Sequence, residues 1–470
     1  MTGTILEVPM ATCLLAVCRF LFFPPSLSTL DRVASDQTHF RFWSLLNELG
    51  YGSTGRFLRP LWKRLPRTLV YRPILVPLLT WHFARAARKA SRSPHAKHLG
   101  PPANELFYDI LTAVLKYPGL RPDDYFIYGL HLRANTPFAE KAADNLDVRF
   151  LVDLAAIDRP RTKQRFSNVA NDKRRFHDLV REHGFPAAPV LAVFHEKVEW
   201  IDERELPRRD LFVKPISGTL SIGASLVSFD AGTNRYTIHK PAEPFPAALN
   251  FPGYPGESLP GDDLIGVLTE LGKKLPLMLQ PKLKCHPSIE KLTGSSQLTT
   301  CRVISARVIG SHAELLGAYL RMPADARGSD AFASGGIAAS LDLETGRILS
   351  AKKKYEDETL TSHPHTQEPF GGVEVAYAKD AFTACRAVHD ALAGIDELLV
   401  PVVGFDVAIA EDGYWFMEAN CPCDVQFQKL GVPYGSDPTY VRCVQSYLAP
   451  LQSRSRIAVD PILRKPVASG

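Results

Sequence analysis

Hydrophobic residues recur at helical spacing in two segments of the chain. In the first, Asn104 can cap a helix whose apolar positions fall at i, i+3, i+4, i+7 and i+8, namely Phe107, Ile110, Leu111, Val114 and Leu115. In the second, "NDKRRFHDLVREHGFP", Asn171 or Asp172 can cap the helix, and Gly184 followed by Pro186 can end it. Its apolar stripe consists of Phe176, Leu179 and Val180. Two amphipathic helices are therefore predicted.

Short apolar runs after the second helix predict strands. The runs are "APVLAVF", "DLFVKP", "ASLVSF", "LMLQPKL", "LTTCRVISARVI", "AELLGAYLRM" and "IAASLDL". Further helices are predicted at "DDLIGVLTELGKK" and "AFTACRAVHDALAGI". Residues 240–262 are rich in Pro and Gly and predict a long loop or a lid that faces a substrate, and residues 451–470 predict a loose basic tail. Because helices and strands do not alternate as regular βαβ units, the pattern favours an α+β fold.

The stretch "GFDVAIAEDGYWFMEAN" (404–420) predicts two strands joined by a turn, and the turn length decides which side chains face each other. A two-residue turn of Asp412 and Gly413 would pair Asp406 with Ala419. A three-residue turn at 411–413, with Gly413 in the left-handed conformation, pairs Asp406 with Glu418 instead. We predict the three-residue turn, which places both carboxylates on one face of the sheet.

Three oxygen-bearing side chains converge in this register, because Asn420 lies two residues after Glu418 and shares its face. Facing carboxylates repel each other unless a cation lies between them. The oxygens of Asp406, Glu418 and Asn420 suit Mg²⁺, which also binds phosphate oxygens of substrates. The alternative is a solvated pair of carboxylates at the end of a strand, which the aromatic surroundings disfavour.

Positively charged residues supply candidate partners for phosphates. Gly218 and Gly223 have the GxxxxG spacing of a P-loop, but the Lys-Ser/Thr pair that should follow is missing. Lys214 instead precedes this loop on a strand, where its amine and the loop N–H groups can bind phosphates, unless it is an ordinary edge-strand lysine. Lys173 lies in the first turn of a helix, where the helix dipole disfavours it unless an anion is near. Arg302, inside the apolar strand "TTCRVIS", requires an anionic partner such as a phosphate or a substrate carboxylate.

The composition is that of an ordinary globular protein. Of 470 residues, 45% are hydrophobic and 22% are charged, which excludes disordered and fibrous classes and allows two or three domains. The eight cysteines lack paired CxxC spacing, which fits reduced thiols in the cytoplasm. The close spacing of Cys421 and Cys423 is interpreted as incidental and not as a metal site. The beginning of the chain, "MATCLLAVCRFLFFPP", lacks a basic start and a cleavage site, so a buried or interfacial helix is favoured over a signal peptide.

The net charge of +5 hides a local basic segment. Eleven Lys and Arg residues and no acidic residue lie between Glu48 and Glu105. No apolar run there reaches the roughly 20 residues that span a bilayer. This segment is interpreted either as an accessory helical region with a solvated basic face, or as a peripheral contact with an anionic membrane through residues 56–97, at the inner face. Nucleic acid is an unfavoured partner, because no recognition motif accompanies the basic residues.

In combination and in this order, these motifs resemble the ATP-grasp superfamily, and within it the sugar-transfer-associated ATP-grasp proteins. The closer resemblance lies in "NDKRRFHDLVREHGFPAAP", "LQPKLKCHPSIEKLTGSSQLTTCRV", "SDAFASGGIAASLDLETGRI" and "VGFDVAIAEDGYWFMEANCPCD". It runs from about residue 120 to 445 and does not cover the first hundred residues. The "CPC" after Asn420 departs from the residues that relatives often carry there, which affects the expected acceptor side of the site.

The resemblance implies an ATP-grasp fold in which two α+β subdomains sandwich a nucleotide, and it assigns roles to the candidate residues. Lys173 and Lys214 would bind the ATP phosphates, together with the glycine loop at Ser217, Gly218 and Gly223. The adenine would lie near the "LMLQPKL" segment with Gln280, Arg302 would neutralise the γ-phosphate, and Asp406, Glu418 and Asn420 would hold Mg²⁺. Arg302 and Lys214 are the expected catalytic residues.

The domain organisation expected on this basis has five parts: a basic, mainly helical accessory region (1–103), a pre-ATP-grasp region (104–170), a small subdomain with the lysines and the glycine loop (171–280), a C-terminal subdomain with the Mg²⁺ site (281–450), and a tail (451–470). The implied activity is an ATP- and Mg²⁺-dependent ligase that joins a carboxylate to an amine or another nucleophile through an acylphosphate, and the implied context is polysaccharide or sugar-conjugate biosynthesis. A phosphotransferase and a nucleotide-binding scaffold of a glycan assembly complex are the alternatives.

Overall fold

A computed structural model describes most of the chain from residue 84 onward. The described ranges are 84–93, 101–116, 124–132, 169–217, 224–239, 258–326, 335–396 and 400–447, with single positions between them. The predictions for the first 83 residues, for the loop glycines Gly218 and Gly223, for most of 240–262 and for the tail at 451–470 fall outside these residues. Within the described part of the chain, no helix is both long and apolar enough to cross a membrane.

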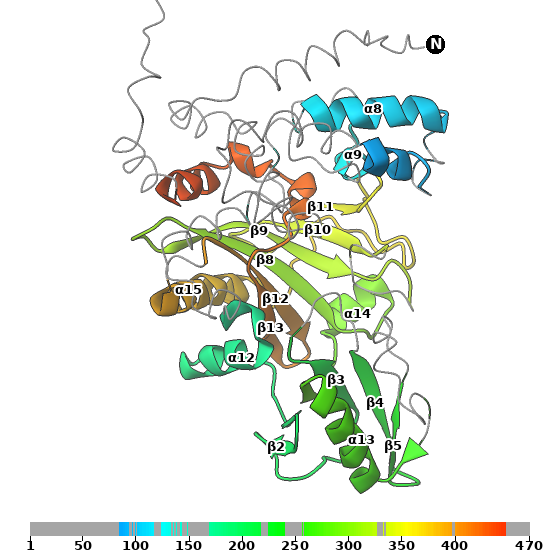
Figure 1. Ribbon diagram of the computed structural model, residues 1–470, viewed down its shortest axis with the longest axis vertical. Coiled ribbons are helices and arrows are strands. Elements are labelled where there is room, and N and C mark those ends of the chain that lie inside the picture. Colours follow the sequence, from blue (N-terminus) through cyan, green and yellow to red (C-terminus); the bar gives the residue numbers. More distant parts are fainter. Residues whose placement is uncertain are drawn as a thin grey trace, which may run out of the picture.

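The earliest described helices form a small apolar cluster of their own. A helical segment at 84–90 packs with α8 (Ala103–Lys116) and α9 (Asp124–Ile127), and Leu106 and Ile110 are buried among them. The predicted helical pattern of α8 is confirmed, but the helix begins at Ala103, so Asn104 lies inside its first turn and is not its cap. Figure 1 shows these helices at one end of the molecule, above the six-stranded sheet described below.

The first sheet has seven antiparallel strands in the order β2-β1-β7-β3-β4-β5-β6. Its strands are β1 (Ala192–Phe194), β2 (Val198–Trp200), β3 (Leu211–Pro215), β4 (Ser225–Asp230), β5 (Arg235–Ile238), β6 (Ser258–Leu259) and β7 (Leu277–Pro281). One face packs on helix α13 (Gly261–Lys274), which buries Leu264, Leu268 and Leu271 against the sheet. The short strand β6 and the first two residues of α13 lie inside the segment predicted as loop, which corrects that prediction at 258–262.

The second sheet has six antiparallel strands in the order β11-β10-β9-β8-β12-β13. Its strands are β8 (Thr299–Arg307), β9 (Ala313–Met322), β10 (Ile337–Leu341), β11 (Ile348–Lys353), β12 (Val402–Ala410) and β13 (Gly413–Asn420). Helices α12 (Lys173–Glu182) and α15 (Ala378–Asp396) cover one face, where Phe176 stacks on Phe405 and meets the edge of Phe416. The short helices η9 (Gln426–Leu430) and η10 (Tyr434–Ser436) contribute to an apolar cluster with Tyr319 and Ile304.

The mixed helices and antiparallel sheets confirm the predicted α+β class. The helix predicted after Asn171 or Asp172 is also confirmed: Asp172 is the cap and accepts hydrogen bonds from the backbone N–H groups of Arg174 and Arg175. That helix ends where predicted, because Gly184 adopts a left-handed φ of 75° directly after it.

The chain crosses between the two sheets twice, and both crossings pair with the β12–β13 hairpin. Before β1, the Ala188 N–H donates to the Phe416 carbonyl at 3.0 Å, and the Phe416 N–H donates to the Pro186 carbonyl at 2.8 Å. After β7, the Glu411 N–H donates to the Lys284 carbonyl at 3.0 Å. The hairpin therefore belongs to the six-stranded sheet and also holds both connections to the seven-stranded sheet. Helix α14 (Pro287–Thr293) follows the second crossing.

The hairpin register confirms the predicted pairing of Asp406 with Glu418 but not the predicted turn. Gly413 already pairs with Ala410, so the turn has two residues, 411 and 412, and would by itself put the two carboxylates out of register. A bulge between Phe416 and Glu418 inserts Met417 as an extra residue and restores the pairing. The bulge lies where the edge of β13 is occupied by the connector at 186–188, a tertiary contact that the turn sequence does not encode.

Two glycines of α13 give a matched test of how closely this helix lies on the seven-stranded sheet. A Cβ at Gly272 would lie 2.6 Å from the carbonyl carbon of Phe194, whereas a Cβ at Gly266 would meet no atom within 4 Å. We expect Gly272→Ala to lower the free energy of unfolding by about 1–3 kcal/mol through overpacking against the backbone. Gly266→Ala should raise it by up to about 1 kcal/mol through helix propensity. Urea denaturation measures both; equal effects would contradict this packing.

Candidate active site

Charged residues of opposite sign lie side by side on the face of the six-stranded sheet away from α15. Arg302 of β8 is directly paired with Asp406 of β12, which is in turn paired with Glu418 of β13. The opposite face of the same strands carries Val303 and Phe405, both fully buried in the apolar core. The alternation of strand side chains therefore separates a charged face from an apolar one.

Arg302 and Asp406 form a buried, two-pronged ion pair. The Arg302 Nη2 donates to Asp406 Oδ2 at 3.0 Å, and its Nε donates to Oδ1. The two residues are only 8% and 4% exposed. Burial acts to raise the pKa of Asp406, but Arg302 and a second arginine outweigh it and lower that pKa to about 2. Burial likewise opposes the charge on Arg302, yet Asp406 holds the pKa of the guanidinium above its ordinary value.

The second arginine is Arg321 of β9, which our interpretation of the sequence missed. Its Nη2 lies 3.2 Å from Asp406 Oδ2, and its Nε donates to Thr300 Oγ1 at 2.9 Å. Two guanidinium groups thus converge on one carboxylate. The signal that identified Arg302, a lone arginine in an apolar strand, also exists for Arg321 in "GAYLRM".

Lys173 and Glu418 form the next ion pair along this face. The Lys173 Nζ, at the first position of α12, lies 3.2 Å from Glu418 Oε2. The Asn420 side-chain amide lies 3.5 Å from Glu418 Oε1, on the side away from the lysine contact. The unfavourable position of Lys173 at a helix N-terminus is therefore offset by an anion, which here is a carboxylate of the protein.

Lys214 approaches the same group from β3 of the other sheet. It is 7% exposed, and its Nζ donates to the carbonyl of the bulge residue Met417 at 3.5 Å. Burial lowers the pKa of Lys214 to about 8, with Glu418 acting in the opposite direction and Lys173 in the same one. A buried lysine with such a pKa gains most from a ligand that brings negative charge.

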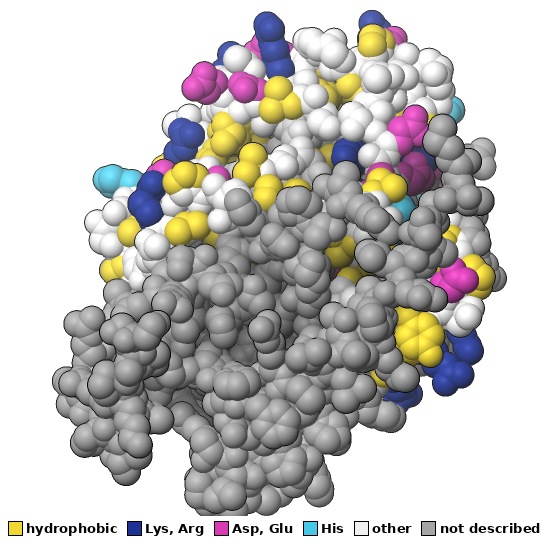
Figure 2. All heavy atoms as spheres, turned by 90° about the horizontal axis from the view of Figure 1, so that it is seen from above, with side chains coloured by type: hydrophobic (Ala, Val, Ile, Leu, Met, Phe, Trp, Pro, Cys, Tyr) yellow, Lys and Arg dark blue, Asp and Glu magenta, His cyan; other side chains and the backbone are white. Residues whose placement is uncertain are grey.

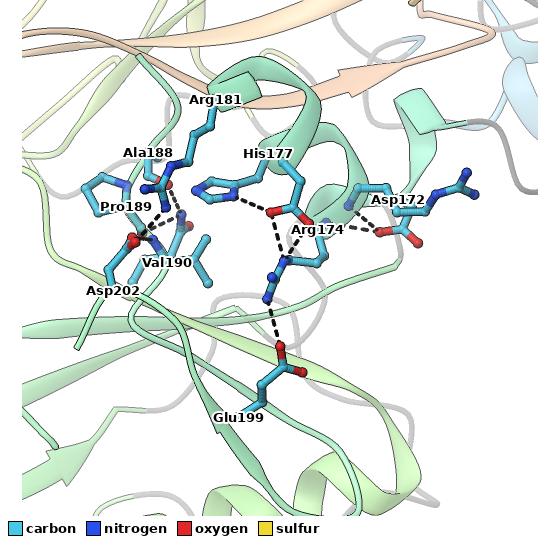
Figure 3. A network of polar contacts seen from close by, with 12 residues as sticks. Asp172, Arg174, His177, Arg181, Ala188, Pro189, Val190, Glu199 and Asp202 are labelled. Atoms are coloured by element: carbon cyan, nitrogen blue, oxygen red, sulfur yellow. Dashed lines mark hydrogen bonds and ion pairs between the residues drawn. The ribbon is translucent and has the colours of Figure 1, made fainter. Parts of the chain in front are cut away.

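Helix α12 is tied to the seven-stranded sheet by a network of polar contacts, which orients the helix that carries Lys173. Two ion pairs of this network are drawn in Figure 3. The Arg181 Nη1 lies 2.6 Å from Asp202 Oδ1, and the Arg174 Nη1 lies 3.7 Å from Glu199 Oε1. The second oxygen of Asp202 accepts from the Val190 N–H at 3.0 Å. Helix and β1–β2 hairpin are thereby joined at both ends of α12.

The remaining predicted site residues lie in different surroundings. Gln280 of β7 is 4% exposed and donates from Nε2 to the carbonyls of Ala188 and Pro189, both at 3.1 Å, so its amide holds the first chain crossing to β7. Ser217 is exposed at the end of a described segment, and Gly218 and Gly223 lie outside the described residues. The structure brings Lys173, Lys214, Arg302, Asp406, Glu418 and Asn420 together.

Gly404 allows the "CPC" segment to lie directly on the charged face. A Cβ at this position would be 2.8 Å from the Cβ of Cys423 and 3.3 Å from Cδ of Arg302. Cys421 and Cys423 are buried, and burial raises the pKa of Cys423 to about 12, so its thiol stays protonated at neutral pH.

The donor set of the site fits a hard divalent cation. Asp406, Glu418 and Asn420 present carboxylate and amide oxygens on one face of two paired strands. Each carboxylate already contacts a cationic side chain of the protein, so bound metal would share or replace those contacts. No group of three or more His, Cys, Asp or Glu residues is placed to hold a metal within the described ranges, so a metal here relies on two carboxylates and an amide.

Two α+β halves that meet at a lysine pair and a D...ExN set define the ATP-grasp class of fold, which confirms the predicted architecture. Residues 260–434 match the model of the family described as "Sugar-transfer associated ATP-grasp", which confirms the resemblance predicted from the motifs for this part of the chain. No curated protein matches the chain.

Several solved structures are similar to parts of the chain. The L-amino acid ligase from Bacillus licheniformis is 9% identical with a TM-score of 0.34; the match covers 64% of this chain and only 54% of the ligase. The D-alanine–D-alanine ligase from Bacillus anthracis is 13% identical with a TM-score of 0.30, covering 62% and 70% of the two chains. D-cycloserine synthetase DcsG is 13% identical with a TM-score of 0.33, covering 65% and 77%.

The buried ion pair predicts an acid dependence of stability. The pKa of Asp406 is lowered from 3.8 to about 2, so its contribution is present above pH 3.8 and is lost as the pH falls toward 2. Between pH 5 and 2 we expect the wild type to lose about 2 kcal/mol more stability than Asp406→Asn. At pH 7 the variant should already be about 3–5 kcal/mol less stable, because the buried guanidinium loses its partner. Denaturant titrations at each pH measure the free energy of unfolding of both proteins. If it changed with pH in the same way in the wild type and in Asp406→Asn, the assignment would be refuted.

Proposed function

We propose that the protein is an ATP- and Mg²⁺-dependent ligase that activates a carboxylate as an acylphosphate and joins it to an amine or another nucleophile. The observation that supports this best is the convergence of Lys173, Lys214 and Arg302 with Asp406 and Glu418, from two sheets, on one charged face. Such a group can bind a triphosphate and its metal, and can stabilise the charge of a transferring phosphoryl group.

The proposed roles follow from position. Lys173 and Lys214 approach from the side of the seven-stranded sheet and would bind the phosphates of the nucleotide as point charges. Arg302 lies farther into the six-stranded sheet, where it would bind the γ-phosphate and stabilise the charge that develops during transfer. The glycine loop with Ser217, Gly218 and Gly223 would add backbone donors, and Gln280 would lie near the adenine.

The proposed reaction has two steps. A carboxylate oxygen of the substrate attacks the γ-phosphorus, and the bond to the β-phosphate oxygen breaks, which releases ADP. An amine then attacks the acyl carbon, phosphate leaves, and the nitrogen loses a proton. Asp406, Glu418 and Asn420 would hold Mg²⁺, which when bound neutralises phosphate charge. Positioning and electrostatics are the main contributions of the protein to both steps.

Two alternatives use the same nucleotide site. In a phosphotransferase the acceptor keeps the phosphate, and in a nucleotide-binding scaffold of a glycan assembly complex no product forms. Product analysis separates them: ADP with an amide or ester, ADP with a phosphorylated acceptor, or no ADP. The family description, "Sugar-transfer associated", supports a place in polysaccharide or sugar-conjugate biosynthesis.

Glu418→Gln keeps the shape of the side chain and removes the charge that Lys173 and the metal require. We expect Mg²⁺-dependent release of ADP, measured with mixtures of small carboxylates and amines, to fall by about 100-fold or more. Glu411→Gln, in the exposed turn of the same hairpin, is the matched control and should retain wild-type turnover. Undiminished turnover in Glu418→Gln would exclude this residue as a metal ligand.

We propose further that the basic accessory segment contacts an anionic membrane surface. Arg85, Arg88, Lys89 and Arg92 are exposed, whereas Ala87 and Ala90 on the same helical stretch are buried. Figure 2 views the molecule from above and shows Lys and Arg side chains at several places around its described surface. Basic residues on one face attract anionic lipid over about a Debye length.

A flotation assay with vesicles tests this contact. The protein should float with vesicles that contain phosphatidylglycerol, and floating should fall several-fold in high salt or when Arg85, Arg88, Lys89 and Arg92 are changed to Gln together. A quadruple change of basic residues elsewhere on the surface, at Lys273, Lys282, Lys284 and Lys291, serves as the control. Equal flotation with neutral and anionic vesicles would exclude an electrostatic contact.

A further inference from the structure

An aromatic residue of the short helix η9 lies against the charged face of the six-stranded sheet. Tyr319 of β9 is directly paired with Arg302 of β8, so the two side chains share that face. The ring of Phe427, from η9, stacks on Tyr319 with 5.2 Å between the ring centroids, and it stacks on Phe332 at 5.1 Å. Phe427 therefore packs beside Arg302 as part of an aromatic cluster of three rings.

The Phe427 ring also contacts the guanidinium of Arg302. The Arg302 Cζ lies 5.8 Å from the centroid of this ring, within the roughly 6 Å over which the negative face of an aromatic ring attracts a cation. Both residues are buried, with 2% of Phe427 and 8% of Arg302 exposed. Because little water competes for the guanidinium there, the attraction is stronger than it would be at the surface.

The two contacts of Arg302 leave one nitrogen of its guanidinium for a ligand. Nε and Nη2 are bound to Asp406. Nη1 has no hydrogen-bond partner among the residues that the structure describes. A guanidinium has five N–H donors, so a phosphate oxygen that binds Nη1 would not require Arg302 to leave Asp406.

Polar contacts of the residues that follow Phe427 hold η9 in place. The Gln428 side chain is fully buried; its Nε2 donates to the Tyr128 hydroxyl at 2.9 Å, and its Oε1 accepts from the Tyr434 N–H at 3.0 Å. The Lys429 ammonium group donates to two backbone carbonyls of the segment after β11, at 2.7 and 2.9 Å. The position of the Phe427 ring is therefore fixed from several sides.

We propose that Phe427 is a positioning residue for Arg302, and that its ring holds the guanidinium in the orientation that meets the γ-phosphate of the nucleotide. The proposal rests on the proposed function, which assigns the γ-phosphate to Arg302. Asp406 binds one edge of the guanidinium, and the Phe427 ring restricts how the guanidinium plane turns about that edge. Phe427 acts through Arg302 alone, because it carries no group that transfers a proton or binds a phosphate.

The contribution of the γ-phosphate to nucleotide binding tests this role without a known acceptor. ADP and the imido analogue of ATP, which is not hydrolysed, are titrated separately by calorimetry in the presence of Mg²⁺. The Kd of ADP divided by the Kd of the analogue measures what the γ-phosphate adds. Phe427→Met and Phe427→Leu, which keep an apolar side chain without a ring, should each lower this ratio about tenfold and leave the affinity for ADP unchanged.

Matched variants separate positioning from packing. Phe332→Met removes a neighbouring ring of the same cluster and leaves the ring that contacts Arg302, so it should keep the wild-type ratio. Phe427→Tyr keeps the aromatic face and should keep the ratio as well. Arg302→Lys should itself lower the ratio, and adding Phe427→Met should lower it no further, because the ring then has no guanidinium to orient. Circular dichroism checks the fold of each variant.

The outcomes distinguish this proposal from the proposed function. If the two aliphatic variants at Phe427 keep the wild-type ratio while Arg302→Lys lowers it, the positioning role is refuted and the proposed function stands. An equal loss in Phe332→Met, or an additional loss in the double variant, would show that Phe427 contributes only packing and would also refute the role. If Arg302→Lys keeps the wild-type ratio, the assignment of the γ-phosphate to Arg302 fails together with the role of Phe427. If the wild type binds neither nucleotide with Mg²⁺, the proposed function itself fails.

Discussion

The ion pair between Arg302 and Asp406 is the interaction on which the arrangement of the site depends. Two opposite charges buried between β8 and β12 are tolerated only when each neutralises the other, because an isolated buried charge costs several kcal/mol. The pair fixes which face of the six-stranded sheet is polar. Once that face is set, the alternation of side chains sends Val303 and Phe405 to the core under α15 and brings Glu418 to the face that meets Lys173.

The second constraint is that two sheets contribute to one site. Lys214 comes from the seven-stranded sheet, and its ammonium group donates to the carbonyl of the bulge residue Met417 on the other sheet. Lys173 comes from a helix that is bound to the β1–β2 hairpin by Arg181 and Asp202 and packed on the other sheet through Phe176. The positions of the two lysines therefore depend on how the sheets are held together, and less on either sheet alone.

Much of this arrangement could be predicted from local patterns, because the main elements carry strong ones. The cap and stripe of α12 and the apolar runs of β7 to β10 follow from spacing along the chain. The pairing of Asp406 with Glu418 agrees with the prediction only because a bulge compensates for the shorter turn. The elements that were not predicted are those with weak local signals. Strand β11 ends in consecutive lysines, and β2 has three residues, so neither shows a period that distinguishes a strand from a loop.

Other features were unpredictable because they depend on contacts between distant segments. The bulge at Met417 arises where the connector at 186–188 occupies the edge of β13, and the sequence of the turn gives no sign of it. The partner of Arg302 was expected to be an anion, and strand order alone decides that it is Asp406, 104 residues away. Arg321 differs: its signal was present in the sequence and was equal to that of Arg302.

The pairing of both chain crossings with the β12–β13 hairpin has a mechanical consequence. A rotation of the seven-stranded sheet has to take place about an axis along this hairpin, because Phe416 and Glu411 hold the chain on either side of it. The bulge at Met417 lies on that axis, one residue before Glu418. Such a rotation would change the distance between Lys214 of the seven-stranded sheet and Glu418, while the row from Arg302 through Asp406 to Glu418 would keep its spacing within the six-stranded sheet.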